Sequence, residues 1–132
     1  MKVEIQRINP TPEEYEAMYK QAFDGQTPMP HHVFAVMVDG EMMAFASVYE
    51  HSWGNLVLQH IGFLNTVMGS KYSIYVKTID ALHGLGYPFI MGIIDSRNII
   101  ALMWALRSGF LINGCRQATD GKLYVEVLRR KE

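Results

Sequence analysis

The segment from Pro88 to Phe110 constrains the fold of this chain more than any other. It begins with the apolar run 89–94, which has the length and β-branched content of a buried strand. Asp95 or Ser96 can then cap a helix, and Gly109 can adopt the left-handed conformation that ends one. The segment therefore predicts a strand, a short helix and a second strand in direct succession.

The predicted helix in this segment has a regular apolar pattern. Ile99, Leu102, Met103 and Leu106 recur at helical spacing, which predicts a face that packs on a sheet. The chain then enters a new strand at Phe110.

Length and composition favour one globular domain over residues 1–132. Hydrophobic residues make up 49% of the chain and charged residues 19%, and no apolar run approaches the ~18 residues of a membrane span. The N-terminus alternates like a strand instead of resembling a signal peptide, and Cys115 is the single cysteine. We expect a soluble protein of a reducing compartment, the cytoplasm.

The charges divide unevenly between the two halves. Residues 1–66 hold three Lys/Arg and eight Asp/Glu, whereas residues 67–132 hold nine and five, so the second half is the one suited to an anion. No basic run interleaved with aromatics indicates nucleic-acid binding. The five His and Cys115 lack metal-ligand spacing, and Cys115 lies in an apolar strand typical of a core position.

The first half predicts a strand, a helix and a three-stranded meander. Thr11-Pro12-Glu13-Glu14 supplies a helix cap, a proline at the first position and a capping-box carboxylate. Asp39-Gly40 is a two-residue hairpin signal between strands 33–38 and 42–50. A third strand, 55–64, follows the turn at Trp53-Gly54-Asn55.

The second half predicts a long helix over 70–86 with Ser70 as its cap, and a closing hairpin of strands 110–117 and 122–128 around Asp120-Gly121. The expected order is β-α-β-β-β-α-β-α-β-β, an α/β fold with a mixed sheet.

This order, together with Asn98-x-x-Ala101 and a Gly109-Phe110 pair eleven and twelve positions after the Asn, resembles the GNAT superfamily of acyl-CoA-dependent N-acyltransferases. The resemblance covers nearly the whole chain and lacks only a short second helix where residues 25–32 lie. It implies a GNAT-like fold, acetyl-CoA as cofactor and direct transfer of the acetyl group to an amine acceptor.

The resemblance also implies a set of cofactor-binding residues. The family's pyrophosphate motif, Arg/Gln-x-x-Gly-x-Gly/Ala, falls on Thr66–Lys71, where only Gly69 matches. Ser70 and Lys71 can meet a phosphate by hydroxyl and charge. Asn98 is either a cofactor contact or a helix-terminal hydrogen-bonding residue. The backbone of Gly62, Phe63 and Leu64 resembles the segment that, in the family, pairs with the pantetheine arm of the cofactor.

Catalytic residues depart further from the family pattern. The position seven residues after Asn98, often a Tyr that protonates the thiolate, is Ala105, and the neighbouring Trp104 does not titrate usefully. For a general base the candidates are Glu50, His51 and above all His60, a polar residue in an apolar strand.

Two hypotheses follow. The chain is either an N-acetyltransferase, or a catalytically inactive GNAT-like binding or assembly protein, of a kind found in bacteria and among tailed phages. The missing Tyr, the single matching Gly of the motif and an expected exposure of aromatic rings around Tyr49, Trp53 and Trp104 favour the second hypothesis. The acceptor, and whether the chain is a monomer or a homodimer, are not determined by the sequence.

Overall fold

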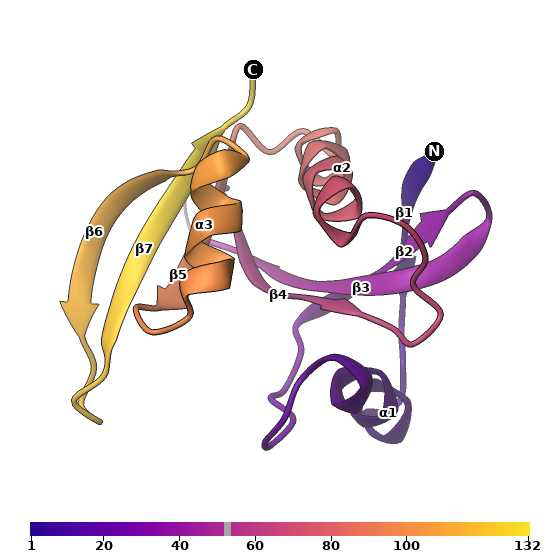
Figure 1. Cartoon of the computed structure of the whole chain (residues 1–132), viewed down its shortest axis with the longest axis horizontal. Helices are drawn as coiled ribbons and strands as arrows, with labels where there is room; N and C mark the ends of the chain where they lie inside the picture. The colour runs from indigo at the N-terminus through magenta and orange to yellow at the C-terminus, as the bar shows by residue number, and fades with distance from the viewer. Residues whose placement is uncertain (52–53) are drawn as a thin grey trace.

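A seven-stranded mixed sheet carries three helices in the part of the chain that the structure, a computed structural model, describes: residues 1–51 and 54–132 (Figure 1). The strands are β1 (Val3–Ile8), β2 (His32–Val38), β3 (Glu41–Glu50), β4 (Leu56–Phe63), β5 (Phe89–Asp95), β6 (Leu111–Gln117) and β7 (Leu123–Arg130). The helices are α1 (Pro12–Ala22), α2 (Lys71–His83) and α3 (Ile99–Arg107).

The sheet order is β1-β2-β3-β4-β5-β7-β6. Neighbouring strands are antiparallel except β4 and β5, which are parallel because α2 connects them across the sheet. The element order predicted from the sequence is confirmed.

Local signals act as the sequence predicts in the first half. Asp39 and Gly40 both have positive φ, 50° and 86°, as a type I′ hairpin turn requires. The Thr11 hydroxyl accepts from the Glu14 N–H (3.2 Å), and the Glu14 carboxylate accepts from the Thr11 N–H (2.9 Å), which completes the capping box. Of the predicted turn Trp53-Gly54-Asn55, Trp53 lies outside the described residues, and Gly54 has a positive φ of 78°.

The helices cover both faces of the sheet. On one face α1 buries Tyr15 and Tyr19 against Phe45 and Leu64. On the other face α2 and α3 pack on the middle strands, where the largest buried cluster includes Ile79, Leu82, Ala105, Ile90 and Val127 (Figure 1). None of the helices in the described residues is long and apolar enough to cross a membrane.

The structure corrects two boundaries of the second half. Ser70 caps α2 as predicted, but the helix ends at His83 and the chain continues through a turn to Gly86. The cap of α3 is Asn98, and neither Asp95 nor Ser96 occupies that position, because β5 extends through Asp95 and a turn follows it.

Two predictions of burial in the same region are wrong. Of the four apolar residues on the predicted face of α3, Leu102 packs on the core, while Ile99, Met103 and Leu106 are exposed. Cys115 is also exposed, since β6 lies at the edge of the sheet.

Candidate active-site cleft

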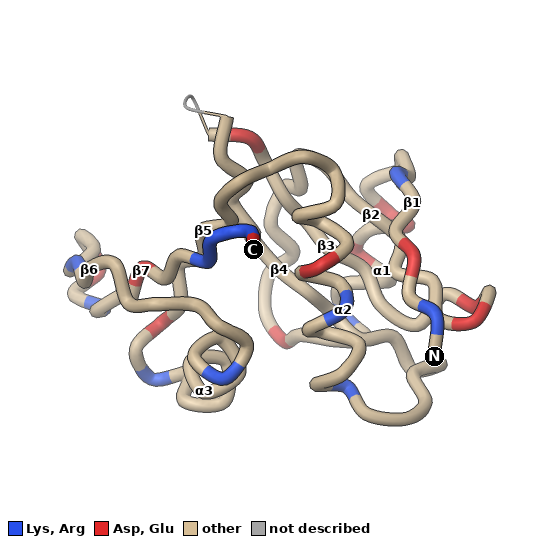
Figure 2. Tube along the Cα trace, turned by 90° about the horizontal axis from the view of Figure 1, so that it is seen from above, with Lys and Arg blue, Asp and Glu red and all other residues tan. Residues whose placement is uncertain are grey.

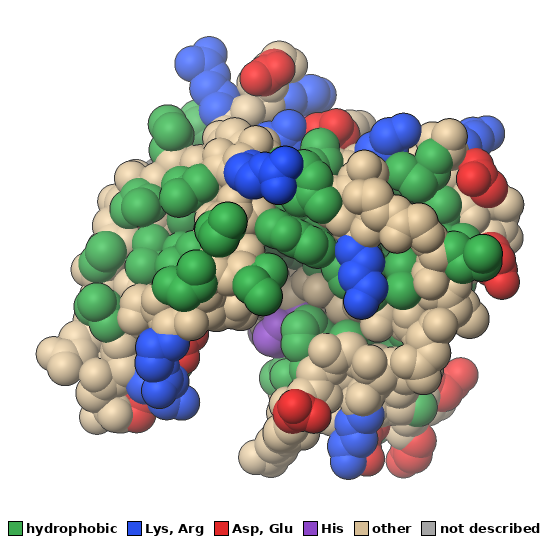
Figure 3. All heavy atoms as spheres, in the orientation of Figure 1, with side chains coloured by type: hydrophobic (Ala, Val, Ile, Leu, Met, Phe, Trp, Pro, Cys, Tyr) green, Lys and Arg blue, Asp and Glu red, His purple; other side chains and the backbone are tan. Residues whose placement is uncertain are grey.

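β4 and β5 separate after a short paired stretch. Their parallel ladder covers Leu56–Leu58 of β4 and Ile90–Gly92 of β5, although β4 continues to Phe63 and β5 to Asp95. Both strands end at the same edge, which is where parallel sheets bind ligands. The space-filling view shows a hollow in this part of the molecule, between the side that carries α3 and the side that carries α1 (Figure 3).

A β-bulge explains why the strands separate there. Ser47 of β3 pairs with His60 and Val48 pairs with Leu58, which leaves Gln59 as an extra residue in β4. A bulge bends its strand and increases the local twist. The Ser47 hydroxyl donates to Gln59 Oε1 (2.8 Å) and holds the bulge in place. The bulge therefore lies directly after Leu58, the last residue that pairs with β5.

His60 is the first residue beyond the bulge. Its ring packs on two aromatic rings of the α1 segment, Tyr19 with centroids 5.6 Å apart and Phe23 at 5.4 Å. This partial burial lowers the pKa of His60 below its ordinary value, so the imidazole is neutral at pH 7. A neutral imidazole can accept a proton.

Glu50 and His60 are not brought together. Glu50 pairs with Leu56 at the start of β4, about 13 Å along the strand from His60. Its carboxylate accepts a hydrogen bond from the Tyr87 hydroxyl (2.7 Å), which raises the pKa of Tyr87. Glu50 thus lies at the closed end of the β4–β5 pair.

The backbone at the end of β4 is divided between β3 and the cleft. The Leu64 N–H donates to the Met43 carbonyl on the β3 side (2.9 Å). Because backbone groups of successive residues point to opposite sides of a strand, those of Ile61 and Phe63 face the opening toward β5. Among the predicted residues 62–64, Phe63 therefore presents its backbone to the cleft, and Ile61 joins it.

Close packing of α1 on the sheet explains why residue 62 is a glycine. A Cβ at this position would lie 2.5 Å from two ring carbons of Phe45 and 3.0 Å from Cβ of Ala22. The absence of a side chain lets α1 approach the sheet closely.

The loop after β4 leads into the positive end of α2. Gly69 has φ +80°, and an added Cβ there would meet no atom within 4 Å, so its backbone is open to solvent. The Ser70 hydroxyl accepts from the Ser73 N–H (3.2 Å), and the first turn of α2 has no acidic residue. The unpaired N–H groups of such a helix start attract anions.

Two cations flank this helix start. The Lys71 ammonium lies 5.7 Å from the ring centroid of Phe63, and the Arg107 guanidinium lies 4.5 Å from that of Tyr72. Figure 2 shows basic residues on both α2 and α3. The sequence pointed to Lys71; Arg107 was missed, because its place beside α2 depends on how the two helices pack.

An aromatic cluster joins β4, α2 and α3 on the same side of the sheet. The indole of Trp104 contacts Phe63 (6.1 Å between centroids), Tyr72 (5.6 Å) and Tyr75 (5.4 Å). Ala105 is buried, so the position of the family's Tyr faces the core. In the sequence, the only sign of this aromatic cluster was that Trp104 is next to Ala105, the position of the family's Tyr.

Asn98 acts as a helix cap. Its Oδ1 accepts from the Ala101 N–H (3.2 Å) at the start of α3. Asn98 and Arg107 lie at opposite ends of α3, about 13 Å apart along its axis. The cap was one of the two roles that the sequence left open for Asn98.

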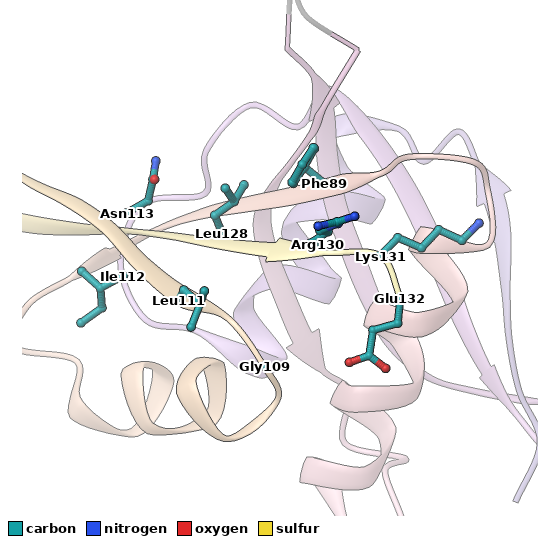
Figure 4. Close-up of a pocket in the computed structure, with 9 residues that line it drawn as sticks. All are labelled: Phe89, Gly109, Leu111, Ile112, Asn113, Leu128, Arg130, Lys131 and Glu132. Atoms are coloured by element: carbon teal, nitrogen blue, oxygen red, sulfur yellow. The ribbon is translucent and has the colours of Figure 1, made fainter.

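Two cavities differ in their relation to these residues. A small cavity of about 120 Å³ lies at the end of β4, between the end of α1 and Lys71. A larger hollow of about 670 Å³ lies on β5, β7 and β6 and contains none of the predicted site residues (Figure 4). Its charged groups belong to the last three residues of the chain. The small cavity at the end of β4, and not the larger hollow, therefore lies beside the candidate cofactor-binding residues.

Comparison with known proteins yields matches among solved structures. No protein-family model and no curated protein sequence matches the chain. An N-acetyltransferase from Staphylococcus aureus Mu50 superposes with a TM-score of 0.72 at 14% identity, covering 98% of each chain. An acetyltransferase from Bacillus subtilis in complex with CoA gives 0.70 at 11% identity, covering 99% of this chain and 100% of that one.

A GNAT family acetyltransferase from Elizabethkingia anophelis, with acetyl-CoA bound, gives a TM-score of 0.65 at 8% identity and covers 98% of each chain. These likenesses place the chain among the mixed α/β acyltransferase folds. Within that class it has the GNAT fold, which confirms the fold that the resemblance implied.

Proposed function

We propose that the chain is an acetyl-CoA-dependent N-acetyltransferase that transfers the acetyl group directly to an amine. The observation that carries this proposal is the cleft itself, in which β4 leaves β5 at the bulge of Gln59, with His60 beyond the bulge and the positive end of α2 after the strand. Two of the similar structures contain CoA or acetyl-CoA, which supports the same ligand here.

The residues at the start of α2 fit a pyrophosphate. Gly69 offers exposed backbone, Ser70 a hydroxyl, and Lys71 and Arg107 positive charge, with no carboxylate in the first turn to oppose an anion. The family motif has Arg or Gln at the position of Thr66 and a small residue at the position of Lys71, and this chain lacks both. The positive charges of Lys71 and Arg107 compensate for the close approach of the pyrophosphate to the backbone that the small residue would allow.

The cleft edge of β4 fits the pantetheine arm. The backbone groups of Ile61 and Phe63 can pair with its amides in the way that an added strand pairs with a sheet edge. Asn98 uses only Oδ1 in its cap, so its amide nitrogen is the group that we propose contacts the cofactor. Gly62 and Leu64 shape this edge through packing.

His60 is the proposed general base. Bound acetyl-CoA supplies an activated thioester. As the amine nitrogen forms the new C–N bond and the C–S bond breaks, His60 accepts the proton that the nitrogen loses. Ala105 offers no acid, so the leaving sulfur takes its proton from water, at a cost of roughly 10²–10⁴ in rate. Glu50, hydrogen-bonded to Tyr87, positions the start of β5 in this scheme.

Isothermal titration with acetyl-CoA tests the proposal before any acceptor is known. We expect micromolar affinity, about −8 kcal/mol. Lys71→Ala should weaken binding roughly tenfold or more, the scale of one charge-assisted hydrogen bond, whereas Lys122→Ala, in the β6–β7 turn, should leave it unchanged.

No binding and no thermal stabilisation at millimolar acetyl-CoA would refute the proposal and favour the inactive binding or assembly protein. If binding is found, release of free thiol in the presence of a panel of amines tests the transfer itself.

A further inference from the structure

The larger hollow, of about 670 Å³, lies at the end of the sheet opposite the candidate active-site cleft (Figure 4). The cleft opens where β4 and β5 end, whereas this hollow lies over the first residues of β5 and β6 and the last residues of β7. Its volume is within the range of small-molecule sites. Its lining, here called the β5–β7–β6 hollow, includes Phe89, Leu111, Leu128, Arg130, Lys131 and Glu132.

Four of these residues lie on the same face of the sheet. Phe89 of β5 pairs with Arg130 of β7. Leu111 of β6 pairs with Leu128 of β7. Directly paired residues share a face, and so do Leu128 and Arg130, which are two residues apart in one strand. The three apolar side chains therefore form a strip across three strands, roughly 10 Å wide, with Arg130 at its end.

This strip is apart from the core of the protein. Val127 packs in the core with α2 and α3, so its neighbour Leu128 faces the other side of the sheet. Phe89, Leu111 and Leu128 belong to none of the hydrophobic core clusters that the described residues form. Leu111 is 73% exposed. A ligand with an apolar body gains free energy by covering such side chains.

Arg130 and Lys131 add positive charge at one end of the strip. Neither side chain has a hydrogen bond or an ion pair within the part of the chain that the structure describes. The Lys131 N–H donates to the Pro88 carbonyl (2.7 Å), which holds both residues beside the start of β5. Among the described residues that line the hollow, Glu132 is the only one with a carboxylate side chain. The lining side chains thus carry one positive charge in excess.

We propose that the β5–β7–β6 hollow binds a small amphipathic carboxylate, whose acid group pairs with Arg130 and whose apolar body covers the strip from Phe89 to Leu111. A guanidinium has parallel N–H donors that match the two oxygens of a carboxylate. An excess of one positive charge suits a monoanion better than a phosphate dianion. Because the hollow lies away from the cleft, binding here does not depend on the proposed acetyl transfer.

Titration of the ¹⁵N-labelled full chain with decanoate, followed by two-dimensional NMR, tests the proposal. We expect saturable shifts at the backbone amides of Leu111, Leu128 and Arg130. The expected Kd is about 1 mM, the affinity that typical ligand efficiency gives for about 12 non-hydrogen atoms. Because each buried CH₂ strengthens binding roughly fourfold, octanoate should bind roughly four- to tenfold more weakly. Decylammonium has the same tail and the opposite charge, and should leave these amides unshifted.

Two pairs of variants separate charge from apolar contact. Arg130→Gln should weaken decanoate binding roughly three- to tenfold, the range between an exposed ion pair and a charge-assisted hydrogen bond. Arg116→Gln removes an exposed guanidinium of β6 outside the hollow and should leave the Kd unchanged. Leu111→Ser should also weaken binding, whereas Leu123→Ser, at a 47% exposed residue outside the hollow, should not.

The same spectra contain the results that would overturn the proposal. These are no saturable shift at roughly 10 mM decanoate, shifts confined to the cleft residues 59–64, equal binding of decylammonium, or an Arg130→Gln Kd equal to that of the wild type. Shifts in the hollow that grow with protein concentration in the absence of ligand would show that a second copy covers it, which also contradicts a small-ligand site. The dispersion of each spectrum shows that the variant is folded.

Discussion

Substituting Gly62 by Ala places a methyl group where α1 packs on the sheet. The new Cβ would lie 2.5 Å from ring carbons of Phe45 and 3.0 Å from Cβ of Ala22. The Phe45 ring is fully buried and meets Tyr15 edge-on, with centroids 5.7 Å apart, so it has no free space to move into. The clash must therefore strain the sheet or displace α1.

The size of the effect follows from two opposing contributions. Overpacking a core by one methyl group costs about 1–3 kcal/mol. Replacing Gly by Ala makes the unfolded chain less flexible, which offsets about 0.4–1 kcal/mol. The clash is the larger contribution, and we expect a net loss of about 1–2 kcal/mol. For 132 residues the entropy of unfolding is roughly 0.28 kcal/mol/K, so Tm should fall by roughly 4–7 °C.

Thermal unfolding followed by far-UV circular dichroism measures this shift. Gly114→Ala is the matched control, because the nearest atom to a Cβ there, Glu126 Oε2, is 4.0 Å away, and its Tm should be unchanged or slightly higher. An unchanged Tm for Gly62→Ala would refute the packing role. If acetyl-CoA affinity fell at the same time, Gly62 would instead be a cofactor contact.

Three further predictions concern titration and capping. Activity should fall as pH drops through the pKa of His60, which burial holds below its ordinary 6.5, and His60→Gln should remove this limb of the kcat/KM profile; an unchanged limb would exclude His60 as the base. Asn98→Ala should lower Tm through loss of about 0.5–2 kcal/mol, whereas Asn98→Asp should retain the cap; equal melting of all three would contradict the capping role. The Arg97 guanidinium lowers the pKa of Asp95 to about 2, so the stability from this pair is present above the ordinary pKa of 3.8 and is lost as pH falls toward 2. Arg97→Ala should raise the pKa of Asp95 measured by carboxyl NMR, and a value still near 2 would show that Arg97 is not the cause.

Signals confined to a few neighbouring residues predicted the fold well. The Asp39-Gly40 turn and the Thr11–Glu14 capping box both formed, because each satisfies its own backbone groups locally. Helical periodicity likewise identified α3 as a helix. It did not identify which side of α3 is buried, since that depends on where the sheet ends.

The candidate site was predictable in part. Lys71 and the helix start at Ser70 could be found from the sequence, because a helix cap and an adjacent cation are local features. The bulge at Gln59 could not be found, since it depends on the register between β3 and β4. Arg107 reaches the same helix start only because α3 packs beside α2.

The sequence by itself determined the order of strands and helices, the caps of α1 and α2, the hairpin turn at Asp39-Gly40, and the resemblance to an acyltransferase fold, because these depend on backbone preferences and on spacing along the chain. The tertiary structure alone decided three things: that β4 and β5 separate at Gln59, that Glu50 lies far from His60, and that Cys115 and the stripe of α3 face solvent. The physical reason is that each depends on pairing and packing between segments distant in the sequence.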